Sequence, residues 1–548
     1  MMKKAIKKLL AALLAVAMVC AMAIPAFAYD TKEDLNTKHE YDAFQIFNGD
    51  VTGNDTDGFK ISNVTWGKNI PHPEDFLEKL TEDSTIGGEF KTDFTPQEAV
   101  AVISKWHDSD NNSIAFARFV CNYIYTDSNA NREPVIQGGH TGGFELPMAG
   151  YYLIVDTSPF SGGDSYHAYN SFLLKVNQKN YHVQITPKVV KPTVEKKVYD
   201  NDDIGSTGEN NGWGSSADHA INEEFQFRLI AKLPESENNG RAYDYYNKYT
   251  VRFNDTLSNG ITYDRLDSVV INSNGHTYDI PKDSPKYNVD VSHLESDHSF
   301  VVSIPDVKTC VEDPEFNLNN GATITVTYTA HLNDNAFVNT ASGSTENKNS
   351  VRLQYSNNPR PDDEYWGYTP NYTPESEVYV YTYQLNNTKL AETENGTPLP
   401  GAGFRLYSGK DCTEEQEVKL YKKGNFYYPI KDATDKAQDA VEMFSDEHGQ
   451  FNVKGLDAGT YYLKETKTPA DYSACDDTKI VISATHDEHN VNLSGESNLN
   501  NKIINKKAGG ITLPSTGGIG TTLFYVVGGG LMVAAIVLLV TKKRMENK

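Results

Sequence analysis

Phe225-Gln226-Phe227-Arg228-Leu229 indicates the fold class of this chain. Apolar and polar residues alternate along this stretch, as in a β-strand with one buried and one exposed face. The same alternation recurs at 249–253, 300–304 and 322–328, and further short strands are expected at 379–385, 404–407, 459–464 and 480–483. Short strands at regular intervals are typical of β-sandwiches. We therefore expect an all-β protein made of tandem sandwich domains.

The N-terminal third adds helical signals to this pattern. Thr95-Pro96-Gln97-Glu98 has the form of a capping box with proline at the first helical position, so we expect a helix from there through Trp106. A second helix is expected over 114–125, and strands over 151–156 and 171–176. The first domain is therefore predicted to be a β-domain with helical insertions.

Two changes in composition divide the chain into three domains, as a prior of about 150 residues per domain suggests. Pro187-Lys188-Val189-Val190-Lys191-Pro192 is a stiff, extended link, and 357–374 is a loop rich in Pro, Asn, Asp and Tyr. We place the domains at 29–187, 188–378 and 379–512.

The N-terminus has the features of a cleaved signal peptide. Lysines at positions 3, 4, 7 and 8 precede an apolar run over 9–24, and Ala26-Phe27-Ala28 fits the small-x-small cleavage rule. We assign 1–28 to the signal peptide, so the protein is predicted to be secreted.

The C-terminus, 513–548, combines a short motif with an apolar segment. Leu513-Pro514-Ser515-Thr516-Gly517 precedes an apolar run over 519–540 and then Lys542-Lys543-Arg544. At about 1.5 Å per residue the run spans roughly 33 Å, enough to cross a bilayer. The arrangement resembles the LPxTG sorting signal of Gram-positive surface proteins. The resemblance implies that a sortase cleaves between Thr516 and Gly517 and joins Thr516 to an amine.

The third domain carries four further motifs in order. Tyr462-Leu463-Lys464-Glu465-Thr466, followed by Pro469-Ala470-Asp471-Tyr472, resembles the E-box of Gram-positive pilins. Lys389 precedes Leu399-Pro400-Gly401-Ala402-Gly403-Phe404, and Asn505 lies shortly before the sorting signal. This resembles an immunoglobulin-like collagen-adhesin B-type domain. The resemblance implies a self-formed isopeptide bond between Lys389 and Asn505, assisted by Glu465.

The chemistry of such a bond sets its own requirements. The lysine must be neutral to attack an amide, and burial favours its neutral form. A buried carboxyl stays protonated and can polarise the amide carbonyl through a hydrogen bond. The three groups must be held in contact, which supplies the proximity.

The middle domain resembles the middle domain of the same pilins. Strand alternation directs Lys196 inward within Thr193-Val194-Glu195-Lys196-Lys197-Val198, and it directs Asn349 inward within 349–357. We expect a second isopeptide between Lys196 and Asn349 with Asp255 as the assisting acid. Lys197 and Asn347 remain alternatives.

Val183-Gln184-Ile185-Thr186-Pro187-Lys188 resembles the pilin motif WxxxVxVYPK, with Lys179 and Thr186 as departures. The resemblance makes Lys188 the amine that accepts Thr516, and Lys191 is the alternative.

The whole chain thus resembles a sortase-assembled major pilin, a structural protein with no enzymatic activity and no cofactor. Tension would enter at Lys188, cross both isopeptides and leave at Thr516. The first domain lies outside that line, and Val155 occupies the position of the E-box glutamate, so no cross-link is expected there. The implied partners are a pilin-type (class C) sortase, a housekeeping sortase and peptidoglycan, identical subunits and minor pilins. The alternatives are a monomeric wall-anchored adhesin and a basal or tip minor pilin.

Composition excludes other classes of function. A net charge of −24 argues against nucleic acid as a partner. Residues 108–119 begin like a calcium loop but lack its glycine and its final glutamate, so no metal site is predicted. Cysteines are few, and Cys412 with Cys475 form the one pair that shares a domain and can bridge.

Overall fold

The structure is a computed structural model of the chain. It describes residues 40–54, 58–107, 110–140, 144–157, 171–176, 182–183, 191–201, 212–236, 241–343, 346–359, 372–433, 437–508, 535, 537 and 542. The predicted signal peptide, Lys188 and the motif 513–517 lie outside these residues. No helix among the described residues is long and apolar enough to cross a membrane. The predicted span 519–540 falls almost wholly outside them.

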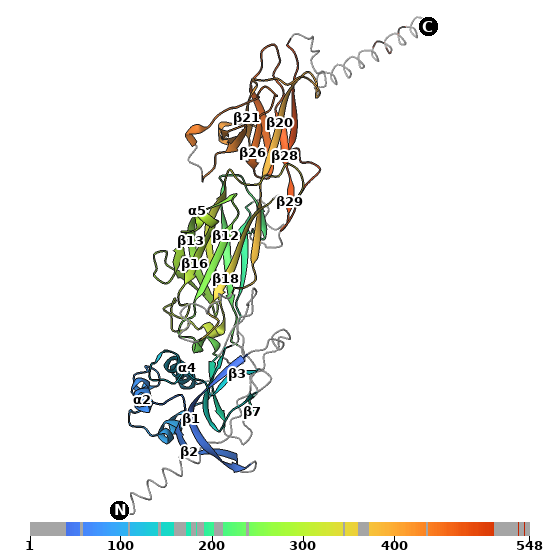
Figure 1. The fold of residues 1–548 in the computed structure, drawn as a ribbon. Coiled ribbons are helices and arrows are strands. Elements are labelled where there is room, and N and C mark those ends of the chain that lie inside the picture. The colour runs from blue at the N-terminus through green and yellow to red at the C-terminus, as the bar shows by residue number, and fades with distance from the viewer. Residues whose placement is uncertain are drawn as a thin grey trace, which may run out of the picture. The chain divides into compact units, whose positions relative to one another are not determined.

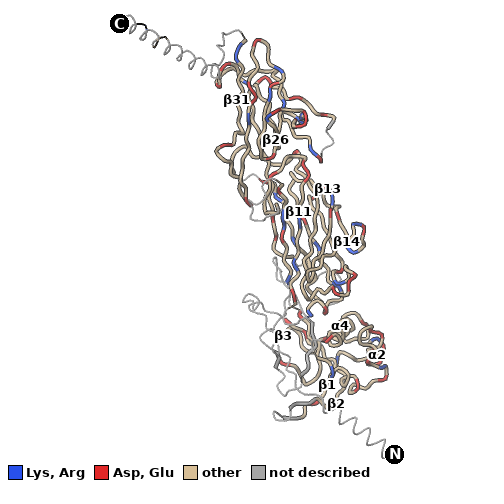
Figure 2. The backbone as a smooth tube through the Cα atoms, turned by 180° about the vertical axis from the view of Figure 1, so that it is seen from behind, with Lys and Arg blue, Asp and Glu red and all other residues tan. Residues whose placement is uncertain are grey.

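The chain divides into two compact units. One comprises 1–382, 431–433 and 484–492, and the other comprises 383–430, 434–483 and 493–548. Acidic and basic positions are interspersed along the described backbone of both units (Figure 2).

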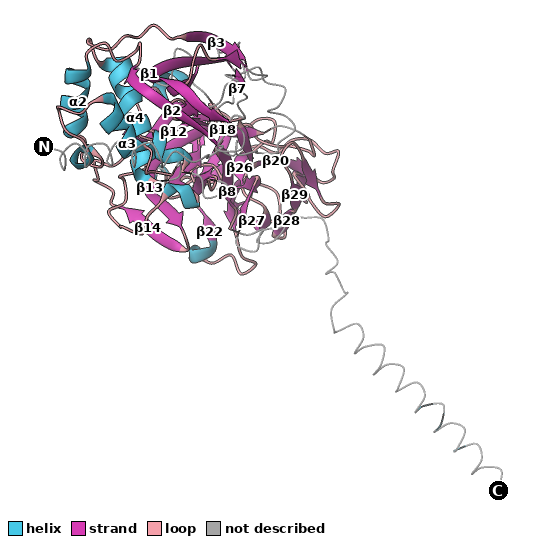
Figure 3. Ribbon diagram, turned by 90° about the horizontal axis from the view of Figure 1, so that it is seen from below, coloured by secondary structure: helices cyan, strands magenta, loops and turns pink. Residues whose placement is uncertain are grey.

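The first sheet, with the order β2-β1-β5-β6 and β3 beside β1, carries helices on one face (Figures 1 and 3). The helices and the strands β1, β2 and β5 share one apolar core that includes Phe44, Phe76, Phe116 and Leu153. The elements are β1 (Glu40–Asn54), β2 (Gly58–Trp66), α2 (Pro73–Thr81), η2 (Gly87–Glu89), α3 (Pro96–Ile103), α4 (Asn111–Thr126), β3 (Ile136–His140), β4 (Phe144–Glu145), β5 (Gly150–Asp156), β6 (Ser171–Val176) and β7 (His182–Val183).

The capping box is present at the start of α3. The Thr95 side chain accepts a hydrogen bond from the Glu98 amide, and the Glu98 side chain accepts one from the Thr95 amide. The helix ends at Ile103, three residues before the expected end at Trp106. In the turn that follows, the amides of Lys105 and Trp106 donate to carbonyls only three residues back, which closes the helix early.

Residues 193–381 form two six-stranded sheets. Their orders are β10-β19-β18-β12-β16-β15 and β14-β13-β17-β11-β8-β9. The elements are β8 (Thr193–Tyr199), β9 (Trp213–Gly214), β10 (Ser216–Asp218), β11 (Glu224–Leu233), η3 (Ala242–Tyr245), β12 (Val251–Leu257), β13 (Ile261–Ser273), β14 (His276–Ile280), β15 (Asn288–Asp290), α5 (Leu294–Asp297), β16 (Ser299–Ile304), η4 (Leu318–Asn320), β17 (Ala322–Leu332), β18 (Asn347–Tyr355) and β19 (Ser376–Tyr381).

Strand β11 explains why the two sheets pack face to face. Its odd-numbered residues from Phe225 to Leu233 are buried, and most of the residues between them are partly exposed. The alternation that predicted a half-buried strand therefore gives this sheet one apolar face, which packs against the other sheet.

The second unit is a smaller pair of sheets. One has the order β23-β24-β26-β20-β31 and the other β22-β21-β27-β28, with β25 beside β21. The elements are β20 (Tyr383–Ala391), β21 (Gly403–Tyr407), η5 (Glu414–Gln416), β22 (Glu417–Val418), β23 (Leu420–Lys423), β24 (Phe426–Pro429), β25 (Met443–Phe444), η6 (Ala437–Asp439), β26 (Asn452–Leu456), β27 (Gly459–Lys467), β28 (Thr478–Ile482) and β31 (Asn500–Asn505). The hairpin of β29 (Ala484–His486) and β30 (Val491–Leu493) lies mostly in the first unit. The predicted all-β architecture, with helices confined mainly to the first domain, is confirmed.

Candidate lysine–asparagine sites

The first candidate site lies between the two sheets of residues 193–381. Lys196 comes from β8, Asp255 from β12 and Asn349 from β18. Lys196 is 2% exposed, and the other two residues are fully buried. The alternation along β8 buries Lys196 and Val198 together, so the strand carries the amine into an apolar core.

A fourth side chain, Tyr328 of β17, joins these three. Lys196 Nζ donates to Asp255 Oδ2 and to Tyr328 Oη, the second at 3.1 Å. The Tyr328 hydroxyl donates to Asp255 Oδ1 at 3.2 Å and accepts from Asn349 Nδ2 at 2.6 Å. The lysine and the asparagine amide therefore contact the same phenolic oxygen.

Burial shifts the ionisation of this site toward neutral groups. Burial lowers the pKa of Lys196 to about 8, although the nearby Asp255 carboxylate acts in the opposite direction. Burial also raises the pKa of Asp255, against the attraction of Lys196. The pKa of Tyr328 lies well above its usual value for the same reason, so its hydroxyl keeps its proton.

The two alternative residues have other partners. Lys197 points away from the site, and its Nζ lies 2.9 Å from Glu195 Oε1. Asn347 is buried, but its amide is engaged by the backbone of Phe337 and Val380. Of the residues that the sequence left open, Lys196 and Asn349 are the ones that the structure brings together.

The second candidate site lies in the second unit. Lys389 comes from β20, Asn505 from β31 and Glu465 from β27. Strands β20 and β31 are parallel neighbours, with Lys389 opposite Ile503 and Ala391 opposite Asn505. This pairing sets the lysine and the asparagine on the same inward face. The side chains of Lys389 and Glu465 are fully buried.

All three groups of the second site are in direct contact. Lys389 Nζ donates to Asn505 Oδ1 at 2.5 Å and lies 3.2 Å from Glu465 Oε1. Asn505 Nδ2 donates to the same Glu465 oxygen at 2.8 Å. The sequence predicted that the carboxyl would contact the amide oxygen. Here it contacts the amide nitrogen, and half a turn of the amide exchanges the two atoms.

Sequence reasoning missed two residues of these sites. Tyr328 shares its strand face with Ile324 and Val326, so alternation could have placed it inward, but its contacts depend on three other strands. Cys475 lies in a loop, where no periodicity applies. Its backbone amide donates to Glu465 Oε2 at 3.0 Å, and Lys389 Nζ approaches its sulfur at 3.4 Å.

The bridge that the sequence allowed between Cys412 and Cys475 is not formed. Both are free thiols. Cys412 Sγ contacts Asp477 Oδ2 at 3.8 Å, whereas Cys475 is turned toward Lys389. The two sulfurs therefore have different partners.

Other predicted residues have simpler surroundings. Val155 is fully buried in the apolar core between the first sheet and its helices. Lys191 is partly exposed and lies two residues before β8. Lys188, Leu513, Pro514, Thr516 and Gly517 lie outside the described residues.

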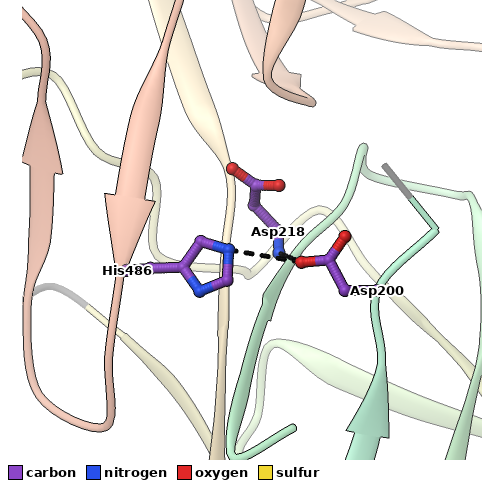
Figure 4. A group of neighbouring side chains, drawn as sticks. All are labelled: Asp200, Asp218 and His486. Atoms are coloured by element: carbon purple, nitrogen blue, oxygen red, sulfur yellow. Dashed lines mark hydrogen bonds and ion pairs between the residues drawn. The ribbon is translucent and has the colours of Figure 1, made fainter. Parts of the chain in front are cut away.

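Within the first unit, Asp200, Asp218 and His486 offer ligand atoms that all lie within 4.8 Å of one another (Figure 4). No sequence pattern indicates this cluster, because His486 is far from the two aspartates along the chain. Its Nε2 lies 3.2 Å from Asp200 Oδ2, and its Nδ1 contacts Ser216 Oγ at 2.9 Å. One nitrogen and two carboxylates could hold a divalent cation. A direct contact between His486 and Asp200 is compatible with the same geometry without a cation.

Three family models match this chain. They are a prealbumin-like fold domain at 384–498, a Gram-positive pilin backbone subunit 2, Cna-B-like domain at 235–359, and the LPXTG cell wall anchor motif at 505–547. No curated protein sequence matches the chain significantly.

Several solved pilin structures resemble the chain. The T6 backbone pilin of Streptococcus pyogenes is 17% identical, with 86% of this chain and 96% of that chain covered and a TM-score of 0.46. The major pilin SpaD of Corynebacterium diphtheriae is 19% identical, with 70% and 86% covered and a TM-score of 0.41. The major pilin RrgB of Streptococcus pneumoniae is 15% identical, with 70% and 87% covered and a TM-score of 0.39. Similarity at this level assigns no residue role.

The family models place a backbone-pilin domain, a prealbumin-like domain and a wall-anchor motif in this order along one chain. The protein is therefore a cell-wall-anchored surface protein that contains a Gram-positive backbone-pilin domain and a prealbumin-like domain.

Proposed function

We propose that this protein is the shaft subunit of a covalently polymerised cell-surface pilus. A pilin-type sortase would cleave after Thr516 and join its carbonyl to Lys188 of the next subunit. A housekeeping sortase would attach the finished polymer to peptidoglycan, and minor pilins would complete it. The domain limits 29–187, 188–378 and 379–512 are part of this proposal.

The observation that carries the proposal is the pair of buried lysine–carboxyl–asparagine sites. A buried lysine without chemistry to perform is unusual, because desolvating its charge costs several kcal/mol. Lys389 contacts both an acid and an asparagine amide, and Lys196 contacts an acid and the tyrosine hydroxyl that binds an asparagine amide. The recurrence of the set in two separate sandwiches favours a shared purpose over an accident of packing.

We propose that each set forms an isopeptide bond without an enzyme. In the second site, neutral Lys389 Nζ attacks Cγ of Asn505, and the new N–C bond replaces the Cγ–Nδ2 bond. Lys389 Nζ loses one proton and the departing nitrogen gains one, so it leaves as ammonia. Glu465 Oε1 lies within 3.2 Å of the attacking nitrogen and 2.8 Å of the leaving one, so it can carry that proton.

The positions of the bonds suit a load-bearing role. Lys196 lies eight residues after Lys188, and Asn505 lies shortly before Thr516. Tension that enters at one linkage and leaves at the other would cross both sandwiches through covalent bonds rather than through strands. The first domain, with Val155 in an apolar core, lies outside this path.

Intact mass tests the internal bonds. The recombinant mature protein should be lighter than its sequence by two molecules of ammonia. Lys389→Ala, Glu465→Ala and Lys196→Ala should each be lighter than their own sequence by only one molecule of ammonia. A wild-type mass equal to the sequence mass would contradict both bonds.

A wall-anchored adhesin that is never polymerised is the main competing function. Anchored monomers and polymers differ in a denaturing gel of cell-wall extracts. The pilus proposal requires a ladder of high-mass species, and a single band would favour the adhesin.

A further inference from the structure

The two candidate sites differ in how the acid reaches the asparagine. In the second site Glu465 contacts both nitrogens that exchange partners. In the first site the acid is an aspartate, one methylene shorter. Asp255 contacts Lys196 Nζ, but among the described contacts it reaches Asn349 only through Tyr328. The Tyr328 hydroxyl therefore connects the shorter acid to the asparagine amide through hydrogen bonds.

We infer that Tyr328 is a catalytic residue for the bond between Lys196 and Asn349, and that its hydroxyl carries the proton between the attacking and leaving nitrogens. This inference rests on the proposed isopeptide chemistry. Its basis is contact with both reacting nitrogens: Tyr328 Oη lies 3.1 Å from Lys196 Nζ and 2.6 Å from Asn349 Nδ2.

The proton can be followed step by step. Attack of neutral Lys196 Nζ on Cγ of Asn349 turns the planar amide nitrogen into an amine with a lone pair. The Tyr328 hydroxyl, which accepts a hydrogen bond from the planar amide, then donates its proton to this amine. The Cγ–Nδ2 bond breaks, and ammonia leaves. The proton that Nζ gives up restores the hydroxyl, directly or through Asp255, so the tyrosine is unchanged at the end.

The surroundings of the amide oxygen strengthen the case. Asn349 Oδ1 is buried and has no hydrogen-bond partner in the part of the chain that the structure describes. In this orientation of the Asn349 amide, negative charge that develops on its oxygen during the attack meets no hydrogen-bond donor among the described residues. Proton transfer to the leaving nitrogen is the assistance that the contacts of Tyr328 can supply.

The tyrosine is held firmly enough to act in this way. Tyr328 is fully buried, and its ring packs against Phe227, Phe300 and Tyr263 with centroids 5.0–5.7 Å apart. These contacts involve the ring and not the hydroxyl. Tyr328→Phe should therefore keep the ring packing and remove the hydroxyl with its hydrogen bonds to Lys196, Asp255 and Asn349.

The experiment compares the two bonds in one molecule. Mature Tyr328→Phe protein is purified soon after synthesis, and each sandwich is recovered by proteolysis for mass measurement over time. General acid–base catalysis contributes about 10²–10⁴-fold. We expect the Lys196–Asn349 bond to form at least 100-fold more slowly, while the Lys389–Asn505 bond forms at the wild-type rate.

Two controls separate the possible outcomes. Asn349→Ala and Asn349→Ala/Tyr328→Phe both lack the bond, so the difference between their melting temperatures measures what the hydroxyl contributes through its hydrogen bonds to Lys196 and Asp255 alone. If Tyr328→Phe fails to fold, site-specific 3-fluorotyrosine at position 328 retains the shape and changes the acidity of the hydroxyl. An altered rate of the first bond alone then supports the inference.

Completion of the first bond at the wild-type rate in Tyr328→Phe overturns the role of Tyr328 and leaves the isopeptide proposal intact. A wild-type protein that loses no ammonia overturns the isopeptide proposal itself.

Discussion

Removal of the Lys389–Asn505 bond should destabilise the second unit by an amount that the structure allows us to estimate. The proposed bond closes a loop across 116 positions of sequence. In the chain-entropy treatment of cross-links, a loop of this length contributes about 5 kcal/mol at 25 °C by restricting the unfolded chain. For a domain of this size, 1 kcal/mol shifts the melting temperature by about 3–5 °C, so the loss corresponds to roughly 15–25 °C.

Glu465→Gln is the suitable perturbation because it keeps the size of the side chain and removes the acid. Differential scanning calorimetry of the wild type and the variant should show the transition of the second unit shifted down by that amount. The transition of the first unit should stay in place. Asn349→Ala is the matched control, because it should lower the melting temperature of the first unit and leave that of the second unit unchanged. A Glu465→Gln protein that has lost its cross-link by mass yet melts with the wild type would refute the entropic reasoning.

Three further predictions concern the polymer, the pH and the metal ligands. Lys188→Ala should abolish the ladder on denaturing gels of cell-wall extracts while both internal bonds form; a ladder that survives there but is lost in Lys191→Ala would shift the acceptor by three residues. In unreacted Tyr328→Phe protein, the bond at Lys196 should form at a nearly constant rate around neutral pH and more slowly above about pH 8. Burial lowers the pKa of Lys196 to about 8 and raises the pKa of Asp255, so a proton can pass from the lysine to the aspartate and leave both groups neutral and reactive. Above about pH 8 base removes this shared proton, and the acid that assists the reaction is lost. A rate that rises tenfold per pH unit between pH 6 and pH 8 would contradict this reasoning. Chelators should leave the melting temperature unchanged, because His486 already contacts Asp200 and Ser216 directly; a fall of several degrees would show that a cation occupies this cluster.

The fold class and the strand faces could be predicted from the sequence because alternation is local. Lys196 and Asn349 each lie on a strand whose apolar neighbours fix the inward direction, and the sequence is enough to assign that direction. The helix at Thr95 was also predictable, since its cap depends on four consecutive residues.

What the sequence did not predict depends on which strands are neighbours. Nothing near Tyr328 in sequence indicates that its hydroxyl meets a lysine, an aspartate and an asparagine from three other strands. Cys475 and His486 were missed for the same reason, because their contacts join segments far apart along the chain. The orientation of the Asn505 amide depends on hydrogen-bond geometry, which no sequence pattern describes.

The parallel pairing of β20 with β31 lets the second unit resist a pull even before its isopeptide bond has formed. Among the described residues these are the first and last strands of their unit, and they are paired over six residues each, from Asn386 opposite Asn500 to Ala391 opposite Asn505. A pull on the entry of β20 and on the exit of β31 acts at opposite ends of a parallel pair. The strands are therefore sheared along their length, so all their hydrogen bonds resist together instead of unzipping one after another. In a newly folded subunit, the hydrogen bonds between these two strands therefore already resist the pull. The covalent bond then fixes the same strand alignment.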